Sequence, residues 1–411
     1  MLTDPSLFFI RRLKVQIRLQ RRNTKIMKSR KILIVAAAAS LFIGCKGNSG
    51  NKAEDPLAAS GRTQRTENLL KNLKAQAQKG YMYGHQDDPV YGVGWVGDEN
   101  RSDVKSVCND YPAVMGFDLG HLELGDSANL DGVPFTRMRK EIINQFERGG
   151  VVTLSWHVDN PLTGGTAWVD GGEKSEQERQ TVASVLEGGE KHELFLAWID
   201  RVADFLNSLQ TSNGVKVPVL FRPWHEHTGS WFWWGQDLCS EEQYKALWVL
   251  TENRLKADGV TNALYAYSCG SEYWQHEEKY LERYPGDEYI DVVGFDHYCT
   301  AAEGDTAALA KYTEQLEILL TTLCSIAEKH GKVPAITETG YEGIKCSNWW
   351  TVYLQPACEK FPISYVLTWR NAHNRPSHFF GPSPSHRDAE DFVAFYNNEK
   401  TLFAKDLNAL Y

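Results

Sequence analysis

The sequence contains no glycine-rich phosphate or dinucleotide loop, no pair of cysteines spaced as CxxC and no internal repeat. The missing loop counts against an open doubly wound sheet that binds a nucleotide. The spacing of the cysteines makes a zinc site an unfavoured interpretation. If Cys45 is modified, seven cysteines remain, so at least one of them is free. The sequence does not specify which of the others pair as disulfides in an oxidising compartment.

Basic residues are scarce beyond the first 45 positions. The 411 residues include 44 Lys and Arg against 53 Asp and Glu, a formal charge of −9. Residues 1–45 hold ten of the basic residues and one Asp, so residues 46–411 carry a formal charge of −18. This acidic body argues against nucleic acid or another polyanion as partner, and it is compatible with a neutral polymer.

The apolar run near the N-terminus is too short to cross a bilayer comfortably. Residues 32–43 are apolar except for Ser40, and the basic segment 27–31 precedes them. This pattern is typical of an export signal. Residues 41–45, Leu-Phe-Ile-Gly-Cys, resemble a bacterial lipobox, although Phe42 departs from the usual Leu. We therefore expect Cys45 to be lipidated, which places the protein in the outer membrane, on its periplasmic or cell-surface side.

Three segments are expected along the chain. Residues 1–26 fit no part of a signal, so we predict that translation starts at Met27 and that the leader ends at Cys45. Residues 46–62 are rich in Gly, Asn, Ser, Ala and Lys and predict a flexible tether. We expect residues 63–411 to form a single domain with no further module appended to it. We expect this domain to act as a monomer that contacts the membrane only through the lipid.

Eight short, β-rich apolar runs, mostly separated by amphipathic stretches, predict a parallel sheet covered by helices. Eight such units favour a closed (β/α)₈ barrel over an open sheet. The predicted strands are 81–84, 113–117, 151–156, 217–221, 263–267, 292–295, 333–337 and 365–368. The predicted helices are 67–78, 135–148, 191–209, 241–258, 306–330 and 348–359, with two more at 388–396 and 400–410. Residues 163–191 are predicted to form a long loop after the third strand, and Trp168 lies in it.

Polar or aromatic side chains follow all eight predicted strands. In a barrel these positions gather at the carboxyl edge, where active sites lie. One such residue alone would be an ordinary capping or packing residue, but eight in phase predict a site. They are His85, Asp118, His157, His225 with Glu226, Ser268, Asp296 with Tyr298, Glu338, and Trp369 with Arg370.

The segment 221–235 carries the strongest signal. It runs from a predicted strand into Trp224, His225 and Glu226, and four tryptophans lie within residues 224–234. Flat aromatic faces stack on pyranose rings, and a carboxylic acid can protonate a glycosidic oxygen. The alternative is a core aromatic cluster with a paired Glu226. Because His, Glu and Arg would each need a buried partner in a core, the segment favours a sugar site.

A second carboxylate, Glu338, ends the seventh predicted strand, whereas Glu226 follows the fourth. Across a barrel mouth these two groups can face each other. Retaining glycosidases use two carboxyl groups about 5–5.5 Å apart. In this interpretation Glu338 is the nucleophile and Glu226 the acid/base, with a pKa near the working pH. The alternative for Glu338 is a salt bridge with Arg370 or Arg222.

A metal site is a second interpretation of the same residues. His225 and His227 are two positions apart, so on a strand their side chains could converge on one ion, with His85, His157 and Asp296 as further ligands. This account gives the tryptophans no purpose, so we expect neither a metal nor a cofactor.

These motifs resemble those of glycoside hydrolase family 26, chiefly β-mannanases, over roughly residues 64–410. The resemblance rests on the segment 222–235, with shorter matches at 155–157, 294–298, 337–338 and 368–371. It implies a (β/α)₈ fold and a retaining mechanism with Glu226 as acid/base and Glu338 as nucleophile. It also implies that His225 positions Glu226 and the sugar, and that Tyr298 hydrogen-bonds the nucleophile. The further sugar-binding residues it implies are His157, Trp231, Trp369, Arg370, Trp168 and His386.

The resemblance leaves several questions open. His227 and Thr228 stand where the family usually has Met-Asn after the acid/base, which can alter the leaving-group side. The expected substrates are the β-1,4-mannosidic linkages of mannan, galactomannan or manno-oligosaccharides. The alternatives are another β-glycanase of the same family, which would act on β-glucan or xylan, and a non-catalytic glycan-binding lipoprotein. The sequence leaves endo action and mannobiose release both open. An enlarged loop at 159–190 or 118–131 would favour mannobiose release.

Overall fold

The computed structural model describes residues 55–169, 171–271 and 274–411. The predicted leader, Cys45 and residues 46–54 of the predicted tether lie outside these residues. Residues 55–62, the remainder of the predicted tether, contact the barrel, because Arg62 forms an ion pair with Asp291 at 2.7 Å. Within the described ranges, no helix combines the length and apolar character needed to cross a membrane.

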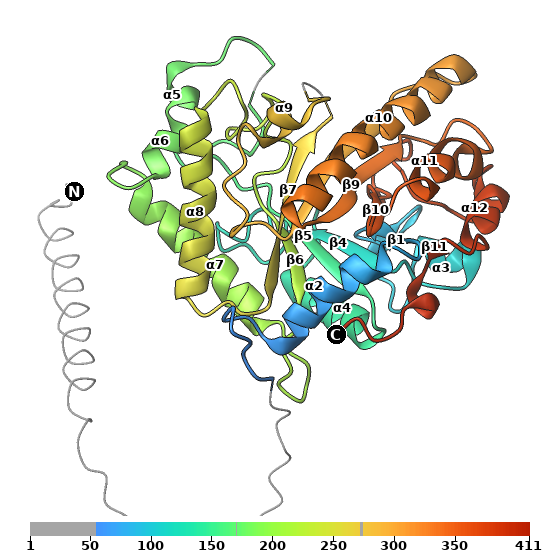
Figure 1. Cartoon of the computed structure of the whole chain (residues 1–411), viewed down its shortest axis with the longest axis horizontal. Helices are drawn as coiled ribbons and strands as arrows, with labels where there is room; N and C mark the ends of the chain where they lie inside the picture. The colour runs from blue at the N-terminus through green and yellow to red at the C-terminus, as the bar shows by residue number, and fades with distance from the viewer. Residues whose placement is uncertain (1–54, 170, 272–273) are drawn as a thin grey trace, which may run out of the picture. The chain divides into compact units, whose positions relative to one another are not determined.

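Eight parallel strands close into a barrel, as the alternation of runs predicted (Figure 1). Neighbouring strands pair in the order β10-β9-β8-β7-β6-β5-β4-β1, and β1 pairs with β10 to complete the ring. The predicted runs 81–84, 113–117 and their six counterparts therefore all correspond to barrel strands. The strands are β1 (Tyr81–Gln86), β4 (Val114–Asp118), β5 (Val151–Ser155), β6 (Val219–Arg222), β7 (Ala263–Gly270), β8 (Val292–Cys299), β9 (Val333–Tyr341) and β10 (Tyr365–Thr368).

Helices surround the barrel, and the longest is α10 (Figure 1). The loop predicted at 163–191 contains two short helices, α5 and α6. The helices are α2 (Gln64–Gln76), α3 (Asp103–Cys108), α4 (Phe135–Glu147), α5 (Glu176–Arg179), α6 (Thr181–Val185), α7 (His192–Ser208), α8 (Glu241–Ala257), α9 (Glu277–Leu281), α10 (Thr306–His330), α11 (Gln355–Glu359) and α12 (Ala389–Tyr396).

Two predicted helices differ from the structure. Residues 348–359 form a π-helix, η1 (Trp350–Leu354), followed by α11. Pro356 lies in the first turn of α11 and has no N–H to bond the preceding turn, so a regular α-helix cannot continue through it. The helix predicted at 400–410 is wrong. Residues Thr401–Leu402 form β11 beside β1, and a 3₁₀ turn, η2 (Ala404–Asp406), follows. Pairing with Tyr81 and Met82 at the start of β1, ahead of the residues that pair with β4, outweighs the weak helical pattern there.

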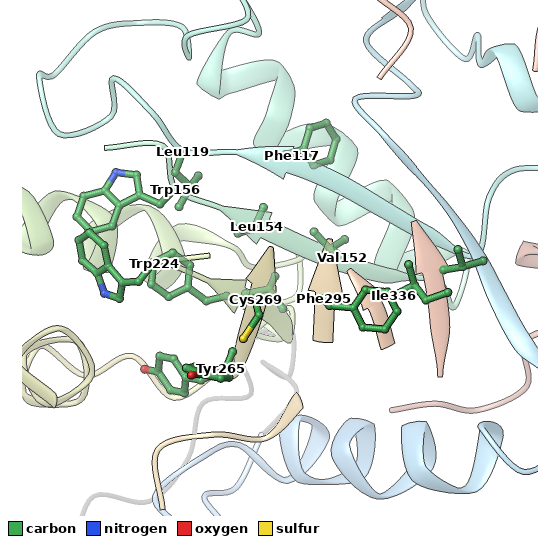
Figure 2. Packing of buried hydrophobic residues seen from close by; sticks show 14 of the residues in the cluster. Phe117, Leu119, Val152, Leu154, Trp156, Trp224, Tyr265, Cys269, Phe295 and Ile336 are labelled. Carbon is green, nitrogen blue, oxygen red and sulfur yellow. The ribbon is translucent and has the colours of Figure 1, made fainter. Parts of the chain in front are cut away.

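Two layers of buried side chains alternate along the barrel strands. Val114, Leu220 and Leu264 belong to one cluster, which also includes Leu69 and Leu73 of α2. The intervening residues belong to a second, larger cluster, as Figure 2 shows for Phe117, Val152, Leu154, Tyr265 and Ile336. Since successive side chains of a strand point to opposite faces, the first cluster fills the barrel interior and the second lies under the helices.

Most of the tryptophans predicted to form a sugar platform are core residues instead. Trp224, Trp233 and Trp234 are fully buried, and their rings pack against one another with centroids 5.3–5.4 Å apart. Trp224 also packs on Trp156 (Figure 2). Of the four tryptophans in residues 224–234, Trp231 is the half-buried one. The aromatic cluster therefore supports the segment that carries Glu226, and Trp231 is left to meet a ligand.

Candidate active site

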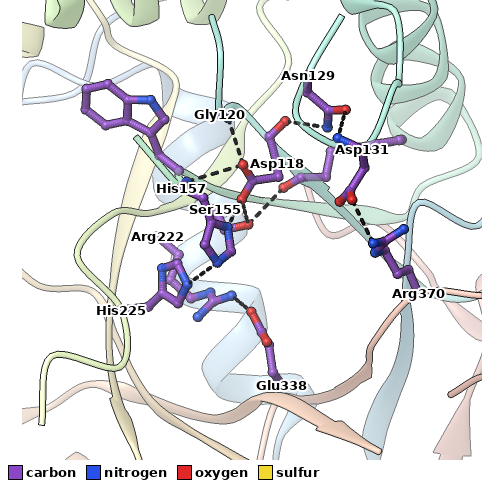
Figure 3. Close-up of polar contacts among 12 residues, drawn as sticks. Asp118, Gly120, Asn129, Asp131, Ser155, His157, Arg222, His225, Glu338 and Arg370 are labelled. Carbon is purple, nitrogen blue, oxygen red and sulfur yellow. Dashed lines mark hydrogen bonds and ion pairs between the residues drawn. The ribbon is translucent and has the colours of Figure 1, made fainter. Parts of the chain in front are cut away.

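The interior face of the barrel ends in a polar layer at the carboxyl edge. Arg222, Ser268 and Asp296 continue the interior positions of β6, β7 and β8 by the two-residue period. The Arg222 guanidinium donates to Oδ2 of Asp296 at 2.9 Å and to Oγ of Ser268 at 3.1 Å. It also pairs with Oε1 of Glu338 (Figure 3). One buried cation thus bridges two buried carboxylates, which is what keeping such charges out of water requires.

A shift in strand register places Glu338 beside Asp296. Phe295 pairs with Ile336, but the next residue, Asp296, pairs with Glu338 rather than Thr337. Thr337 instead donates its hydroxyl to Oδ1 of Asp296 at 2.6 Å. The Tyr298 hydroxyl donates to Oε2 of Glu338 at 2.7 Å. Both oxygens of Glu338 therefore accept hydrogen bonds, one from Arg222 and one from Tyr298, and these bonds fix the orientation of the carboxylate.

Glu226 lies in a tightly constrained turn four residues beyond the end of β6. Its φ of +52° and that of Trp224, +57°, fall in the left-handed region, which is unfavourable for side chains of this size. The surrounding structure holds the turn: the Glu226 N–H donates to the Ser268 carbonyl at 3.0 Å. Tyr244 donates to the Trp224 carbonyl at 2.7 Å, and the Trp234 indole donates to the His225 carbonyl at 2.8 Å. The buried aromatic cluster thus fixes the Glu226 backbone.

The two predicted carboxylates meet at the barrel mouth. One oxygen each from Glu226, Asp296 and Glu338 lie within 4.8 Å of one another. Burial and the neighbouring carboxylates of Asp296 and Glu338 raise the pKa of Glu226 well above its usual value. The indole N–H of Trp231 donates to Oε2 of Glu226 at 2.6 Å and opposes this rise. Burial also raises the pKa of Asp296 to about 7, against the effect of Arg222.

A chain of hydrogen bonds links His157 to His225 (Figure 3). Asp118 accepts from His157 Nδ1 at 2.6 Å and from the Ser155 hydroxyl at 2.5 Å. Burial opposes ionisation of both partners, but their mutual attraction lowers the pKa of Asp118 to about 2 and raises that of His157. The Nε2 atoms of His157 and His225 are 3.1 Å apart. Burial and then Arg222 lower the pKa of His225 well below its usual value, which favours the neutral ring as acceptor of a hydrogen bond from His157.

The histidines flanking Glu226 do not converge on a common point, contrary to the metal interpretation. His225 faces His157, whereas His227 is buried against Tyr244 and Tyr267, with ring centroids 4.5 and 4.7 Å away. The three carboxylates at the mouth have an anionic donor set that suits a cation. However, the Arg222 guanidinium contacts two of them and supplies that positive charge.

The other predicted aromatic residues flank this centre. Trp168 is 47% exposed and stacks on His157, with ring centroids 4.9 Å apart and planes inclined by 10°. The His157 and Trp369 rings lie 6.3 Å apart. A bridge between Trp168 and Phe232 fastens the long loop after β5 to the segment that carries Trp231. These rings form an aromatic wall on the His157 side of the cleft.

Arg370 and His386 lie in different surroundings. Arg370 pairs with Asp131 at 2.8 Å rather than with Glu338, as Figure 3 shows, and its guanidinium also lies 3.4 Å from the Tyr91 hydroxyl. His386 contacts Asp388 and the ring of Phe379, and no contact joins it to the described residues around Glu226 and Glu338. The seven described cysteines are all unpaired, so no disulfide forms within the described part of the chain.

The structure contains the alternative expected for Glu338, an ion pair with Arg222. The pairing of Asp131 with Arg370 was not expected from the sequence. The signal for Arg222 was its position, two residues beyond the interior residue Leu220 of the same strand. Asp131 comes from a loop, and no sequence period predicts its contact with Arg370.

The chain is similar to known glycosidases over most of its length. The family model described as glycosyl hydrolase family 26 matches residues 58–354. A solved GH26 beta-mannanase from Bacteroides ovatus is 53% identical, with a TM-score of 0.80, and the match covers 84% of this chain and 97% of that one. A modular endo-beta-1,4-mannanase from Cellulomonas fimi is 32% identical, with a TM-score of 0.75, over 86% of this chain and 78% of that one. A mannan endo-1,4-beta-mannosidase of Bifidobacterium adolescentis is 29% identical over 93% of this chain, which spans 40% of that protein.

Proposed function

This chain belongs to glycosyl hydrolase family 26, and we propose that it is a retaining hydrolase of the β-1,4-mannosidic linkages in mannan, galactomannan or manno-oligosaccharides. The observation that carries the proposal is the approach of the Glu226 and Glu338 carboxylates to within 4.8 Å. Retaining enzymes have carboxyl groups about 5–5.5 Å apart, whereas inverting enzymes need about 6.5–9.5 Å to admit a water molecule. The mannan substrate follows the similar proteins, which are named β-mannanases.

Glu338 is the nucleophile in this mechanism. One oxygen of its carboxylate attacks the anomeric carbon while the bond to the leaving oxygen breaks, which forms a glycosyl-enzyme. Arg222 and Tyr298 each donate to one of its oxygens, so they hold the carboxylate in one orientation and aim it at the sugar. When the glycosyl-enzyme is hydrolysed, the same donors receive the carboxylate again.

Glu226 is the acid/base. Its raised pKa favours the protonated carboxyl group, whose proton is transferred to the leaving oxygen. After the leaving group departs, the Glu226 carboxylate removes a proton from water, and the hydroxide attacks the anomeric carbon and releases Glu338. Attack twice at the same carbon retains its configuration. The two acids thus differ in role because their hydrogen-bond partners differ.

The sugar is held by the groups around this pair. His157 and His225, which are hydrogen-bonded to each other, lie beside the pair, and Trp168, Trp231 and Trp369 offer aromatic faces to the sugar. We also assign sugar-binding roles to Tyr298, Arg370 and His386. Of these, His386 has the weakest structural support, because its contacts are with Asp388 and Phe379.

Replacement of Glu338 tests the mechanism. Glu338→Ala is expected to lower kcat on mannan by more than about a thousandfold while the affinity for mannohexaose stays within a few-fold of the wild type. Glu342→Ala is the matched control, because Glu342 follows β9 and is exposed, paired with His378. Hydrolysis of mannan by Glu338→Ala at the wild-type rate would overturn the assignment. A wild-type enzyme that cleaves β-glucan or xylan in preference to mannan would overturn the substrate.

Product analysis decides between endo action and mannobiose release. The time course of products from mannan and mannohexaose should show mannobiose from the start if the non-reducing end is blocked, and mixed lengths if the cleft is open. Trp168 of the loop after β5 stacks on His157, and Asp131 of the segment 118–131 pairs with Arg370. If the wild-type enzyme releases mannobiose from the start, shortening either loop is expected to change the products to mixed lengths.

We also propose that the protein is exported and anchored to the outer membrane through a lipid on Cys45. The support is the basic segment 27–31, the apolar run 32–43 and the Gly44-Cys45 pair. Cys45→Ser should release the enzyme from the membrane fraction and abolish incorporation of labelled palmitate. Cys324→Ser, which changes a cysteine of the barrel domain, is the control and should remain membrane-bound. Membrane association of Cys45→Ser equal to the wild type would contradict the anchor.

A further inference from the structure

Arg283 is a buried residue whose guanidinium contacts both ends of the segment that follows Glu226. It lies in the turn after α9 and is 3% exposed. One of its terminal nitrogens donates to the His227 carbonyl at 2.8 Å, and the other donates to the Cys239 carbonyl at 3.1 Å. The second nitrogen also lies 2.8 Å from the Cys239 sulfur. Residues 227–239 lead from Glu226 to the start of α8, so one planar group joins the two ends of this segment.

The same guanidinium supports the turn that carries Glu226. Its central carbon lies 4.4 Å from the centre of the Tyr244 ring, and the Tyr244 hydroxyl donates to the Trp224 carbonyl. Arg283 thus contacts the residue after Glu226 directly, and it contacts the residue two positions before Glu226 through Tyr244. The left-handed backbone at Trp224 and Glu226 persists only where the surrounding structure fixes it. Arg283 supplies part of that support from outside the segment.

The 227–239 segment folds back on itself around Trp231. The Gly229 N–H donates to the Glu226 carbonyl at 2.9 Å, and the Gln236 N–H donates to the Gly229 carbonyl at 2.9 Å. The Trp231 ring lies against Gly229, where an added Cβ would lie 2.2 Å from the ring. The position of the indole N–H that donates to Oε2 of Glu226 therefore depends on the closure of the segment. Separation of the two ends would move this donor away from the acid.

Arg283 and Glu226 lie among different ionisable groups. Those that face Glu226 come from three strands and are Arg222 of β6, Asp296 and Tyr298 of β8, and Glu338 of β9. Those beside Arg283 are His227, Cys239, Tyr244, Tyr267 and Cys269. Because these two sets of described residues share no member, the contacts of Arg283 connect it to Glu226 through the backbone of the segment rather than through the charge cluster at the barrel mouth.

We propose that Arg283 is a positioning residue for the acid/base, which holds Glu226 and its hydrogen-bond donor Trp231 in place by joining the ends of the 227–239 segment. The proposal rests on the hydrolase function above. Since Arg283 is buried behind the segment, it acts through Glu226 and Trp231 rather than on the sugar. Loss of its contacts should therefore change the pH dependence of hydrolysis, which a residue that only stabilises the fold would leave unchanged.

Lysine separates the geometry of this contact from its charge. A guanidinium presents its donors in a fixed plane, whereas the ammonium of lysine is a compact charge on a flexible stem. The variants are Arg283→Lys and Arg283→Met, each made alone and together with Trp231→Phe. Arg254→Met is the matched control, because Arg254 of α8 pairs with Asp200 of α7. The measured quantity is the pH dependence of kcat/KM on mannohexaose, and thermal unfolding checks that each variant is folded under the assay conditions.

Both Arg283 variants are expected to move the alkaline limb of the profile to higher pH by about half a pH unit. The reason is that a displaced Trp231 donates to Glu226 less effectively, so the acid keeps its proton to a higher pH. In the Trp231→Phe background the same substitutions should leave the limb where Trp231→Phe alone places it. Arg254→Met should leave the wild-type limb in place. If Arg283→Met does not fold, Arg283→Lys carries the test, since it keeps the charge.

Three results would overturn the proposal. The first is a limb that stays in place in the folded Arg283 variants. The second is an equal shift with and without Trp231, and the third is a shift in Arg283→Met that Arg283→Lys lacks, because both would follow from the charge of Arg283 alone. If the wild-type enzyme hydrolyses mannohexaose at no pH, the proposed function fails instead.

Discussion

The indole nitrogen of Trp231 lies 2.6 Å from Oε2 of Glu226 and donates a hydrogen bond to it. This bond favours the ionised carboxylate, while burial and the carboxylates of Asp296 and Glu338 favour the protonated form. The pKa of Glu226 therefore results from a balance, and residues on both sides of that balance can be changed separately.

Trp231→Phe should move the alkaline limb of the pH profile of kcat/KM to higher pH. The variant removes the donor that lowers the pKa of Glu226, so the acid keeps its proton to a higher pH. We expect a displacement of about one pH unit, accompanied by a raised KM because Trp231 also lines the cleft. Trp168→Phe is the control, since Trp168 stacks on His157 and has no bond to Glu226. A limb that moves to lower pH would contradict this account.

Asp296→Asn should move the same limb in the opposite direction. Above pH 7 the Asp296 carboxylate is ionised and repels a charge on Glu226, which raises the pKa of the acid. The neutral amide removes that repulsion, so Glu226 loses its proton at a lower pH. The measurement is the pH dependence of kcat/KM on para-nitrophenyl β-mannobioside and on mannohexaose. Shifts of the same sign in Asp296→Asn and Trp231→Phe would show that these two contacts do not set the pKa.

Glu252→Gln should stabilise the fold at alkaline pH. Burial in α8 raises the pKa of Glu252 to about 7, against the pairing with Lys256. Below pH 4.5, the ordinary pKa of the group, Glu252 is protonated in both states and does not affect the free energy of unfolding. Above pH 7 its carboxylate is ionised, and the burial of that charge lowers the free energy of unfolding by its full amount. The amide removes a cost of about 2–3 kcal/mol at pH 8 and has little effect at pH 4. Thermal unfolding at both pH values measures it, with the exposed Glu314→Gln as control.

Chelators should leave hydrolysis unchanged. Arg222 contacts both Asp296 and Glu338, so the carboxylates at the barrel mouth are already paired with a protein cation. Incubation with EDTA followed by assay on mannan should give the same kcat and KM as untreated enzyme. A loss of activity that Ca²⁺ or Zn²⁺ restores would return the metal interpretation to the site.

The periodicity of the sequence predicted the barrel because buried strands and amphipathic helices alternate with little interruption. It also predicted that Glu226 and Glu338 meet, because parallel strands share one carboxyl edge. What it could not predict depends on local backbone geometry. The left-handed turn at Glu226 and the register shift between β8 and β9 leave no mark on hydrophobic patterning. Nor does composition reveal that Trp224, Trp233 and Trp234 support the site from the core.

The pairing of β1 with β10 has a consequence for how the protein is made. The ring remains open until Tyr365–Thr368 emerge from the ribosome, because these residues alone pair with β1 and with β9 at once. Until then a partly synthesised domain that folded would present two unpaired strand edges, the kind of surface that recruits other chains into aggregates. A chain that stays unfolded until β10 is available does not present these two edges.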